Sequence, residues 1–263
     1  MLRRSGQLPV KTDEEVQRVR ESCVIAATVL DKLCKMVAPG LNTYDLDQEG
    51  KKLIEGFGAE SACYNYVGSA KAGAYPGYTC LSINDEVVHG IGSMKRVLRP
   101  GDNITVDVVV RYNDFIGDNA RTVIVGHGDE AMTKLVKTTE EALYHGISFA
   151  KAKNRVGDIS NAVQKYVEKN GMSVVRDFVG HGVGRSMHED PQIPNYGRRG
   201  SGPKLHAGMT IAIEPMVNLG APPIQIGSDG WTASTADGLP AAHFEHTVLI
   251  TEGDAEILTI PEK

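Results

Sequence analysis

The spacing of apolar residues along the chain predicts four helices in two pairs. Thr12 and Glu15 form a capping-box pattern, and the apolar residues that follow recur at helical spacing as far as Val37, where Pro39-Gly40 ends the segment. The same spacing predicts helices over residues 44–57, 130–151 and 156–170. The β-rich segments that follow each pair make the chain an α+β protein.

Residues 61–80 are rich in Gly, Ala, Ser and Tyr without clear periodicity, which predicts a loop or ragged strand beside a site. The pattern from Leu81 to Gly92 returns to strand and places His89 at its end. An offset of 113 residues aligns the helical patterns of the two halves, which favours an internal duplication of residues 13–125 and 126–263 after an arm of residues 1–12. Because helical patterns resemble one another, coincidence stays the alternative explanation of this match.

Two β-branched runs between Asn103 and Gly126 predict an antiparallel hairpin with one aspartate in the apolar middle of each strand. If Tyr112 and Asn113 form the turn, Asp107 and Asp118 face each other directly. If the turn is one residue later, the two are diagonal neighbours on the same face. Carboxylates about 5 Å apart in an apolar sheet need a compensating partner, either a shared proton or a metal ion. The alternative is that one of the two side chains turns outward.

Composition narrows the class of protein. The chain has 263 residues, 41% of them hydrophobic, which is enough for one large domain or two closely packed halves. The balance of 28 basic against 33 acidic residues gives a net charge of -5, so nucleic acid is not the expected partner. Without a long apolar run or a secretory signal, we expect a cytoplasmic protein with no membrane partner and four reduced cysteines.

The second half of the chain adds polar residues to apolar runs. His181 lies among glycines, His188 follows it, and Glu214 and Glu245 each interrupt strand-like sequence. Singly, each is more often a structural or solvated residue than a ligand. With Asp107 and Asp118 they make four carboxylates and one ligating imidazole, a set that suits two divalent ions of Mn, Fe, Co or Zn and the chemistry of a two-metal hydrolase.

These motifs, in their order along nearly the whole chain, resemble those of the type I methionine aminopeptidases, the bacterial-type enzymes of the pita-bread metallopeptidase family. The motifs are Ser82 to Gly90, Asp107 with Asp118, Gly180 to Pro191, Ile213 to Met216, and Phe244 to His246. The resemblance implies a pita-bread fold, in which pseudo-twofold halves share a central curved antiparallel sheet covered by helices, and a single catalytic domain over residues 1–263. It implies removal of the initiator Met from nascent polypeptides with a small second residue, through a water shared by the two ions.

By resemblance, Asp107 ligates one ion, His181 and Glu214 the other, and Asp118 and Glu245 bridge both. Glu214 also takes the proton of the attacking water, while His89 and His188 contact the substrate and are the other two catalytic residues. The methionine pocket departs from the family pattern at Met187 and at residues 70–74. Tyr75, Cys80, Met187 and Trp231 are its expected lining, although a lone Trp is as often a core residue.

Two alternative functions stay open: an Xaa-Pro peptidase of the same fold, and a binding protein that has lost catalysis. The intact ligand set argues against the second, and the short segment before the first helix argues against the first. We expect a monomer, and leave a ribosome contact and a monovalent cation site open. The remaining histidines, at positions 127, 145, 206 and 243, are expected to be surface or structural residues, and His246 to point away from Glu245.

Overall fold

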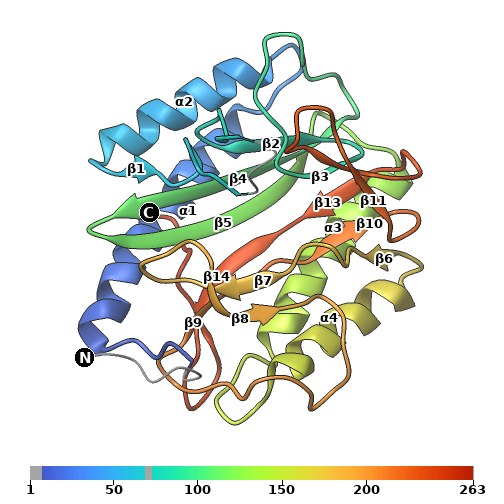
Figure 1. Ribbon diagram of the computed structural model, residues 1–263. Helices are drawn as coiled ribbons and strands as arrows, with labels where there is room; N and C mark the ends of the chain where they lie inside the picture. The colour runs from blue at the N-terminus through green and yellow to red at the C-terminus, as the bar shows by residue number, and fades with distance from the viewer. Residues whose placement is uncertain (1–7, 69–72, 263) are drawn as a thin grey trace.

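The computed structural model describes residues 8–68 and 73–262, and over these ranges helices pack on one face of a curved antiparallel sheet (Figure 1). The helices are α1 (Asp13–Met36), α2 (Thr43–Gly56), α3 (Glu130–Ile147) and α4 (Val156–Lys169). Helix α1 packs on β4 and β5, and α3 packs on β5, β9 and β13. The expected mixture of helices and antiparallel sheet is confirmed.

The main sheet joins both halves of the chain in the order β1-β4-β5-β14-β9-β7-β8, with β2 paired to β4 and β15 to β14. Its strands are β1 (Glu60–Ser61), β2 (Cys80–Ile83), β4 (Asn103–Tyr112), β5 (Phe115–Ile124), β7 (Gly180–Gly182), β8 (Glu189–Ile193), β9 (Thr210–Ile213), β14 (Glu245–Leu249) and β15 (Glu256–Ile257). One small sheet contains β13 (Ala241–His243), β10 (Met216–Asn218) and β6 (Ser173–Val174), and another contains β11 (Ile224–Ile226), β12 (Ala233–Thr235) and β3 (Glu86–Val88).

Helix α1 begins as the sequence predicts. The Thr12 hydroxyl accepts a hydrogen bond from the Glu15 backbone N–H, and the Glu15 carboxylate accepts one from the Thr12 N–H, which completes the capping box. The apolar face of α1, including Val29 and Leu33, is fully buried with Val106 and Val108 of β4. The predicted second helix of each pair is also present, each within two residues of its expected bounds.

The turn of the central hairpin is formed by Asn113 and Asp114, whose φ angles are 48° and 67°. Positive φ at both positions is the requirement of a type I′ hairpin turn, and Asn and Asp tolerate it. Asp107 is therefore paired with Ala120, and Asp118 with Val109. The direct pairing of the two aspartates is wrong, and the diagonal arrangement on one face is the observed one.

Three predicted strands are each divided in two. Leu81 to Gly92 forms β2 and β3, because Asn84 adopts a φ of 57° between them. Residues 209–217 divide at Glu214-Pro215 into β9 and β10, and residues 242–250 divide at Phe244 into β13 and β14. The chain passes from the main sheet to the small sheet in the first case and from the small sheet to the main sheet in the second, and a glutamate lies at each crossing.

The glycines beside His181 allow close packing of strands. A Cβ on Gly180 would lie 2.5 Å from the Ala212 carbonyl oxygen, and one on Gly182 would lie 2.4 Å from the Asp190 carbonyl oxygen. The glycines therefore let β7 approach its neighbours closely.

A helix-helix-strand order occurs twice, as α1, α2 and β1 and then as α3, α4 and β6. The internal duplication itself and the single-domain boundaries stay predictions. Among the described residues, no helix is long and apolar enough to cross a membrane.

Candidate metal centre and substrate cavity

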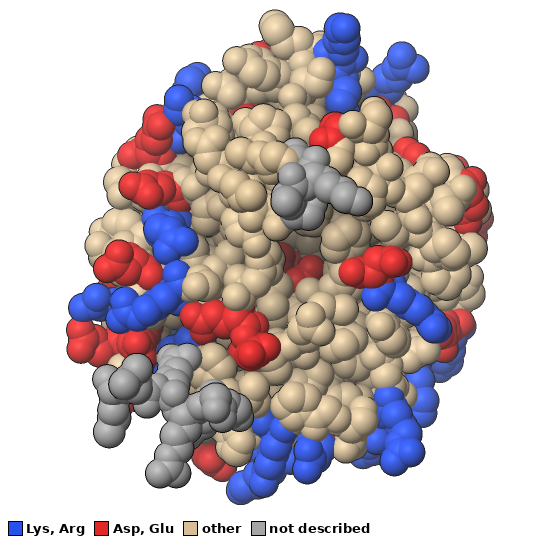
Figure 2. Space-filling view, viewed as in Figure 1, with Lys and Arg blue, Asp and Glu red and all other residues tan. Residues whose placement is uncertain are grey.

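The predicted site residues meet in one cavity of about 640 Å³. Figure 2 shows a hollow on this face of the molecule with acidic side chains at its floor. The cavity is lined by all of the predicted ligands, catalytic residues and pocket residues: Tyr75, Cys80, His89, Asp107, Asp118, His181, Met187, His188, Glu214, Trp231 and Glu245.

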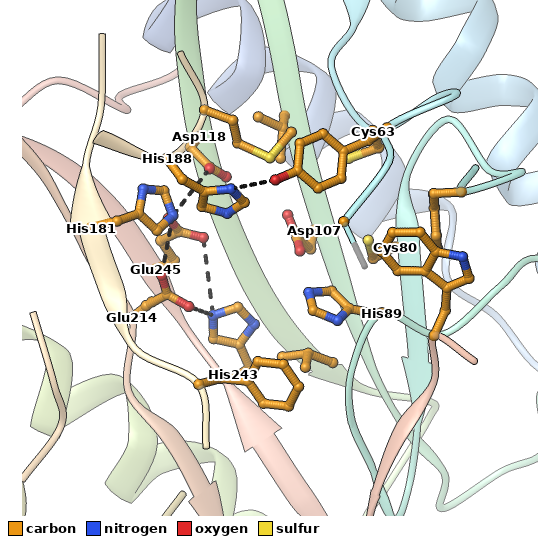
Figure 3. Close-up of a pocket in the computed structure, with 18 of the residues that line it drawn as sticks. Cys63, Cys80, His89, Asp107, Asp118, His181, His188, Glu214, His243 and Glu245 are labelled. Atoms are coloured by element: carbon orange, nitrogen blue, oxygen red, sulfur yellow. Dashed lines mark hydrogen bonds and ion pairs between the residues drawn. The ribbon is translucent and has the colours of Figure 1, made fainter. Parts of the chain in front are cut away.

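Five neighbouring strands deliver the five predicted ligands. Asp107 lies on β4 and Asp118 on β5, Glu245 begins β14, Glu214 follows β9, and His181 is the middle residue of β7. These strands are consecutive in the sheet order β4-β5-β14-β9-β7. Ligands far apart in the sequence therefore come together because the sheet places their strands side by side (Figure 3).

His181 is oriented as a metal ligand would be. Its Nδ1 lies 3.1 Å from the Gly182 carbonyl oxygen, so the proton belongs on Nδ1 and the lone pair of Nε2 faces the cavity. This Nε2 lies 3.4 Å from Glu214 Oε1 and 3.9 Å from Asp118 Oδ2. Burial lowers the pKa of His181 to about 4, which keeps the ring neutral and able to coordinate.

The donor set fits a divalent cation. Ligand atoms of Asp118, His181 and Glu245 all lie within 4.8 Å of one another. Within the described residues, Asp107 Oδ1 and Glu245 Oε1 are buried without a hydrogen-bond partner. Buried polar atoms of this kind need a compensating charge or donor. Oxygen ligands with one imidazole suit Mn, Fe, Co or Zn.

Electrostatics point in the same direction. Burial, followed by the charges of neighbouring carboxylates, raises the pKa of Asp118, Glu214 and Glu245 well above ordinary values. Burial alone is the main cause that raises the pKa of Asp107 to about 7. Without cations the cluster therefore holds protons that bound ions would displace.

The two other predicted catalytic histidines face the same space. The ring centroids of His188 and His181 are 4.5 Å apart, and the Tyr66 hydroxyl lies 2.8 Å from His188 Nδ1. His89 has a φ of 61° and its ring makes an edge contact with Phe178. Burial lowers the pKa of His89 to about 4, so its ring is neutral at physiological pH.

An aromatic and sulfur-containing wall faces the acidic floor. The rings of Tyr75 and Trp231 meet edge to face with centroids 5.3 Å apart, and the Tyr75 hydroxyl donates to the Gly90 carbonyl oxygen at 2.8 Å. Cys80 and Met187 belong to the same apolar cluster. Trp231 is thus a wall residue that is also partly packed in the core. Residues 70–72 of the divergent stretch lie outside the described residues.

His243 does not lie on the surface, which was one of the two expectations for it. It is 2% exposed, lines the cavity, and its Nε2 lies 3.8 Å from Glu214 Oε2. The pattern Ala-His-Phe-Glu contained a signal for it, because residues two apart on a strand share a face and Glu245 was placed inward.

The cavity is also lined by Cys63, Tyr66 and Phe178. The aperiodic sequence around Cys63 and Tyr66 gave no such signal. His246 does point away from Glu245, since its Nδ1 lies 2.8 Å from the Thr259 hydroxyl.

Comparison with known proteins identifies the family. Residues 17–252 match the model of metallopeptidase family M24. The chain belongs to this family. Within it, the chain is similar to the methionine aminopeptidase of Clostridium acetobutylicum, with 45% identity over 96% of this chain and 99% of that protein. Methionine aminopeptidase 1 of Bacillus subtilis is also 45% identical, over 95% of this chain and 98% of that protein.

Solved structures of M24 peptidases agree. The methionine aminopeptidase of Thermotoga maritima superposes with a TM-score of 0.92 at 43% identity, covering 96% of this chain and 99% of that one. A prolidase of Pyrococcus horikoshii gives a TM-score of 0.76 at 21% identity, and this chain covers 64% of it. The second likeness concerns the fold alone. The resemblance read from the motifs, and the pita-bread fold that it implied, are confirmed.

The raised carboxyl pKa values predict that the metal-free protein loses stability as the pH rises above about 6.5. Above that pH, histidines with lowered pKa values such as His89 and His181 are neutral in both the folded and unfolded states. They therefore no longer change the free energy of unfolding as the pH rises. Each buried carboxyl that keeps its proton only when folded then reduces the free energy of unfolding by ~1.4 kcal/mol per pH unit.

The measurement is urea unfolding of chelator-treated protein at pH 6.5 and pH 8, each with and without Mn(II). We expect the metal-free stability to fall and the gain from Mn(II) to grow between the two values. Equal gains at both pH values would contradict the assignment of protons to this cluster.

Proposed function

We propose that this chain is a metal-dependent methionine aminopeptidase that removes the N-terminal Met from polypeptides with a small second residue. The observation that carries the proposal is that five ligand residues from adjacent strands and an apolar pocket line the same cavity. The close relatives named methionine aminopeptidase support the same activity.

The ligand set would hold two divalent ions. Asp107 would serve one ion, His181 and Glu214 the other, and Asp118 and Glu245 both. Strands β5 and β14, which carry Asp118 and Glu245, lie between β4 on one side and β9 and β7 on the other, and this order supports the division. When bound, such ions would supply a Lewis acid and lower the pKa of a water at the site. The metal itself, among Co, Mn, Fe and Zn, stays a prediction.

The protein's own residues would orient the substrate and move the proton. Glu214 would accept the proton of the attacking water. His89 and His188, which are neutral and line the cavity beside the acidic floor, would donate hydrogen bonds to the scissile peptide and stabilise charge that develops on its oxygen. The hydrogen bond between the Tyr66 hydroxyl and His188 would fix the orientation of that ring.

The methionine side chain would bind against Tyr75, Cys80, Met187 and Trp231. Tyr75 is 2% exposed and its hydroxyl is already bonded to Gly90, so its ring offers an apolar surface to the cavity. The flexible thioether side chain of Met187 can adapt its conformation to pack against the methionine side chain of the substrate. A nascent chain at the ribosome, a monomeric state and a cytoplasmic location stay predictions.

The test is release of the first residue from Met-Ala-Ser, Met-Leu-Ser and Gly-Pro by metal-free protein supplied with Mn(II), Fe(II) or Co(II). We expect metal-dependent release of Met from Met-Ala-Ser and much slower release from Met-Leu-Ser. Cleavage of Gly-Pro alone would indicate the Xaa-Pro activity of the fold's prolidases, and no metal-dependent cleavage at all would indicate a binding protein.

A further inference from the structure

In Figure 3 the carboxylates of Glu214 and Glu245 lie between the imidazole of His243 and that of His181. His243 Nε2 lies 3.8 Å from Glu214 Oε2 and 4.0 Å from Glu245 Oε2. Both ring nitrogens of His243 are buried without a hydrogen-bond partner among the described residues. A buried imidazole with two unmet nitrogens is costly unless a partner forms in the working state.

The two oxygens of Glu214 are divided between two histidines. Oε1 lies 3.4 Å from His181 Nε2, and Oε2 lies 3.8 Å from His243 Nε2. The Glu214 backbone is itself fixed, because Asn195 Nδ2 donates to its carbonyl oxygen at 2.9 Å. The two histidine rings face the two oxygens of the Glu214 carboxylate.

The histidines differ in where their proton belongs. His181 has an acceptor for Nδ1–H in the Gly182 carbonyl oxygen, so its Nε2 carries a lone pair. His243 Nδ1 has no hydrogen-bond partner among the described residues, whereas Nε2 faces the carboxylates of Glu214 and Glu245 at 3.8 and 4.0 Å. A proton on Nε2 therefore satisfies a donor that a proton on Nδ1 would leave unpaired.

We propose that His243 is a positioning residue that donates a hydrogen bond from Nε2 to Glu214 Oε2. This bond would hold Oε1 on the side of His181 and the ion, and keep Oε2 directed at the proton that it receives. The 3.8 Å between His243 Nε2 and Glu214 Oε2 is longer than a hydrogen bond, and a small rotation of either side chain would shorten it. Hydrogen bonds in active sites are often long before the substrate complex forms. The inference rests on the proposed role of Glu214 in the aminopeptidase reaction.

Two variants separate this role from others. His243→Gln keeps a donor of similar reach, whereas His243→Leu fills similar space without one. Residues that orient a ligand are worth about 10–100-fold in activity or metal affinity. We therefore expect His243→Leu to lower kcat on Met-Ala-Ser about 10–100-fold with KM nearly unchanged, and His243→Gln to restore most of that loss.

Mn(II) affinity, measured by calorimetry on each protein, is the second readout. Equal loss of kcat in both variants, with an ion lost from both, would overturn the proposal and make His243 a ligand. Equal change without ion loss, an effect on KM alone, or no effect would also overturn it, since the ring would then only fill space. Thermal unfolding checks that His243→Leu folds, and His243→Met replaces it if it does not. Failure of the unsubstituted protein to release Met is a separate result that would reject the proposed function instead.

Discussion

The Asp118→Asn variant is expected to bind neither ion tightly and to release Met from Met-Ala-Ser at least about 10³-fold more slowly than the unsubstituted protein. Asp118 is 4% exposed on β5, within 4.8 Å of ligand atoms on both His181 and Glu245. An asparagine keeps the shape but removes the charge that two cations would share, and metal chemistry of this kind is worth several kcal/mol. Equilibrium dialysis with Mn(II) gives the ion count, and the peptide assay gives the rate.

Asp107→Asn is the matched control, because it makes the same substitution on the neighbouring strand. We expect this variant to weaken one ion and keep the other. If Asp118→Asn also keeps one tightly bound ion, Asp118 does not bridge, and the division of ligands in the proposed centre is wrong.

The Glu214→Gln variant should lose turnover by about 10³-fold or more, because it removes both a ligand charge and the proton acceptor. General base catalysis alone contributes about 10²–10⁴-fold. The substitution keeps the side-chain volume, and the carboxyl it replaces is nine-tenths buried, with burial raising its pKa well above normal. We therefore expect the metal-free variant to fold and to be at least as stable as the unsubstituted protein at pH 8.

His89→Ala is the contrasting variant. It should slow the reaction about 10²–10³-fold, as loss of a charge-stabilising donor does, while keeping both ions. The ratio of bound Mn(II) to protein, measured beside the rate, separates the two roles. Metal loss in His89→Ala, or full activity in Glu214→Gln, would mean that ligand and catalyst were assigned the wrong way round.

The hairpin and the helices were predictable because local signals decide them. The capping residues of α1 and the β-branched runs around Asn113 are each sufficient within a few residues of sequence. The hydrophobic pattern could not decide whether Asp107 and Asp118 are opposite or diagonal. Both turn positions keep the two side chains on one face of the sheet, so both fit the pattern equally well. The sheet order that gathers ligands from both halves was not predicted, and the family resemblance implied only a central curved antiparallel sheet.

The divided strands show why the rest was harder to predict. Apolar runs through Glu214 and Glu245 read as continuous strands, but the chain crosses between two sheets at both positions. Such a crossing depends on neighbours distant in sequence, and only Pro215 marks one of them locally. His243 had a local signal in its two-residue spacing from Glu245, but its position facing Glu214 depends on how β13 lies beside the main sheet. Tyr66 lies in a segment without periodicity, where the sequence predicted only a site nearby.

In the proposed centre, one acidic cavity holds two divalent ions that support removal of N-terminal Met. The most direct measurement is a titration of the metal-free protein with Mn(II) in which bound ion and Met release from Met-Ala-Ser are recorded on the same samples. We predict that up to two ions bind per chain and that Met release appears only as they bind. Met release that is complete without added or residual metal, or binding of ions with no release at saturation, would contradict the claim.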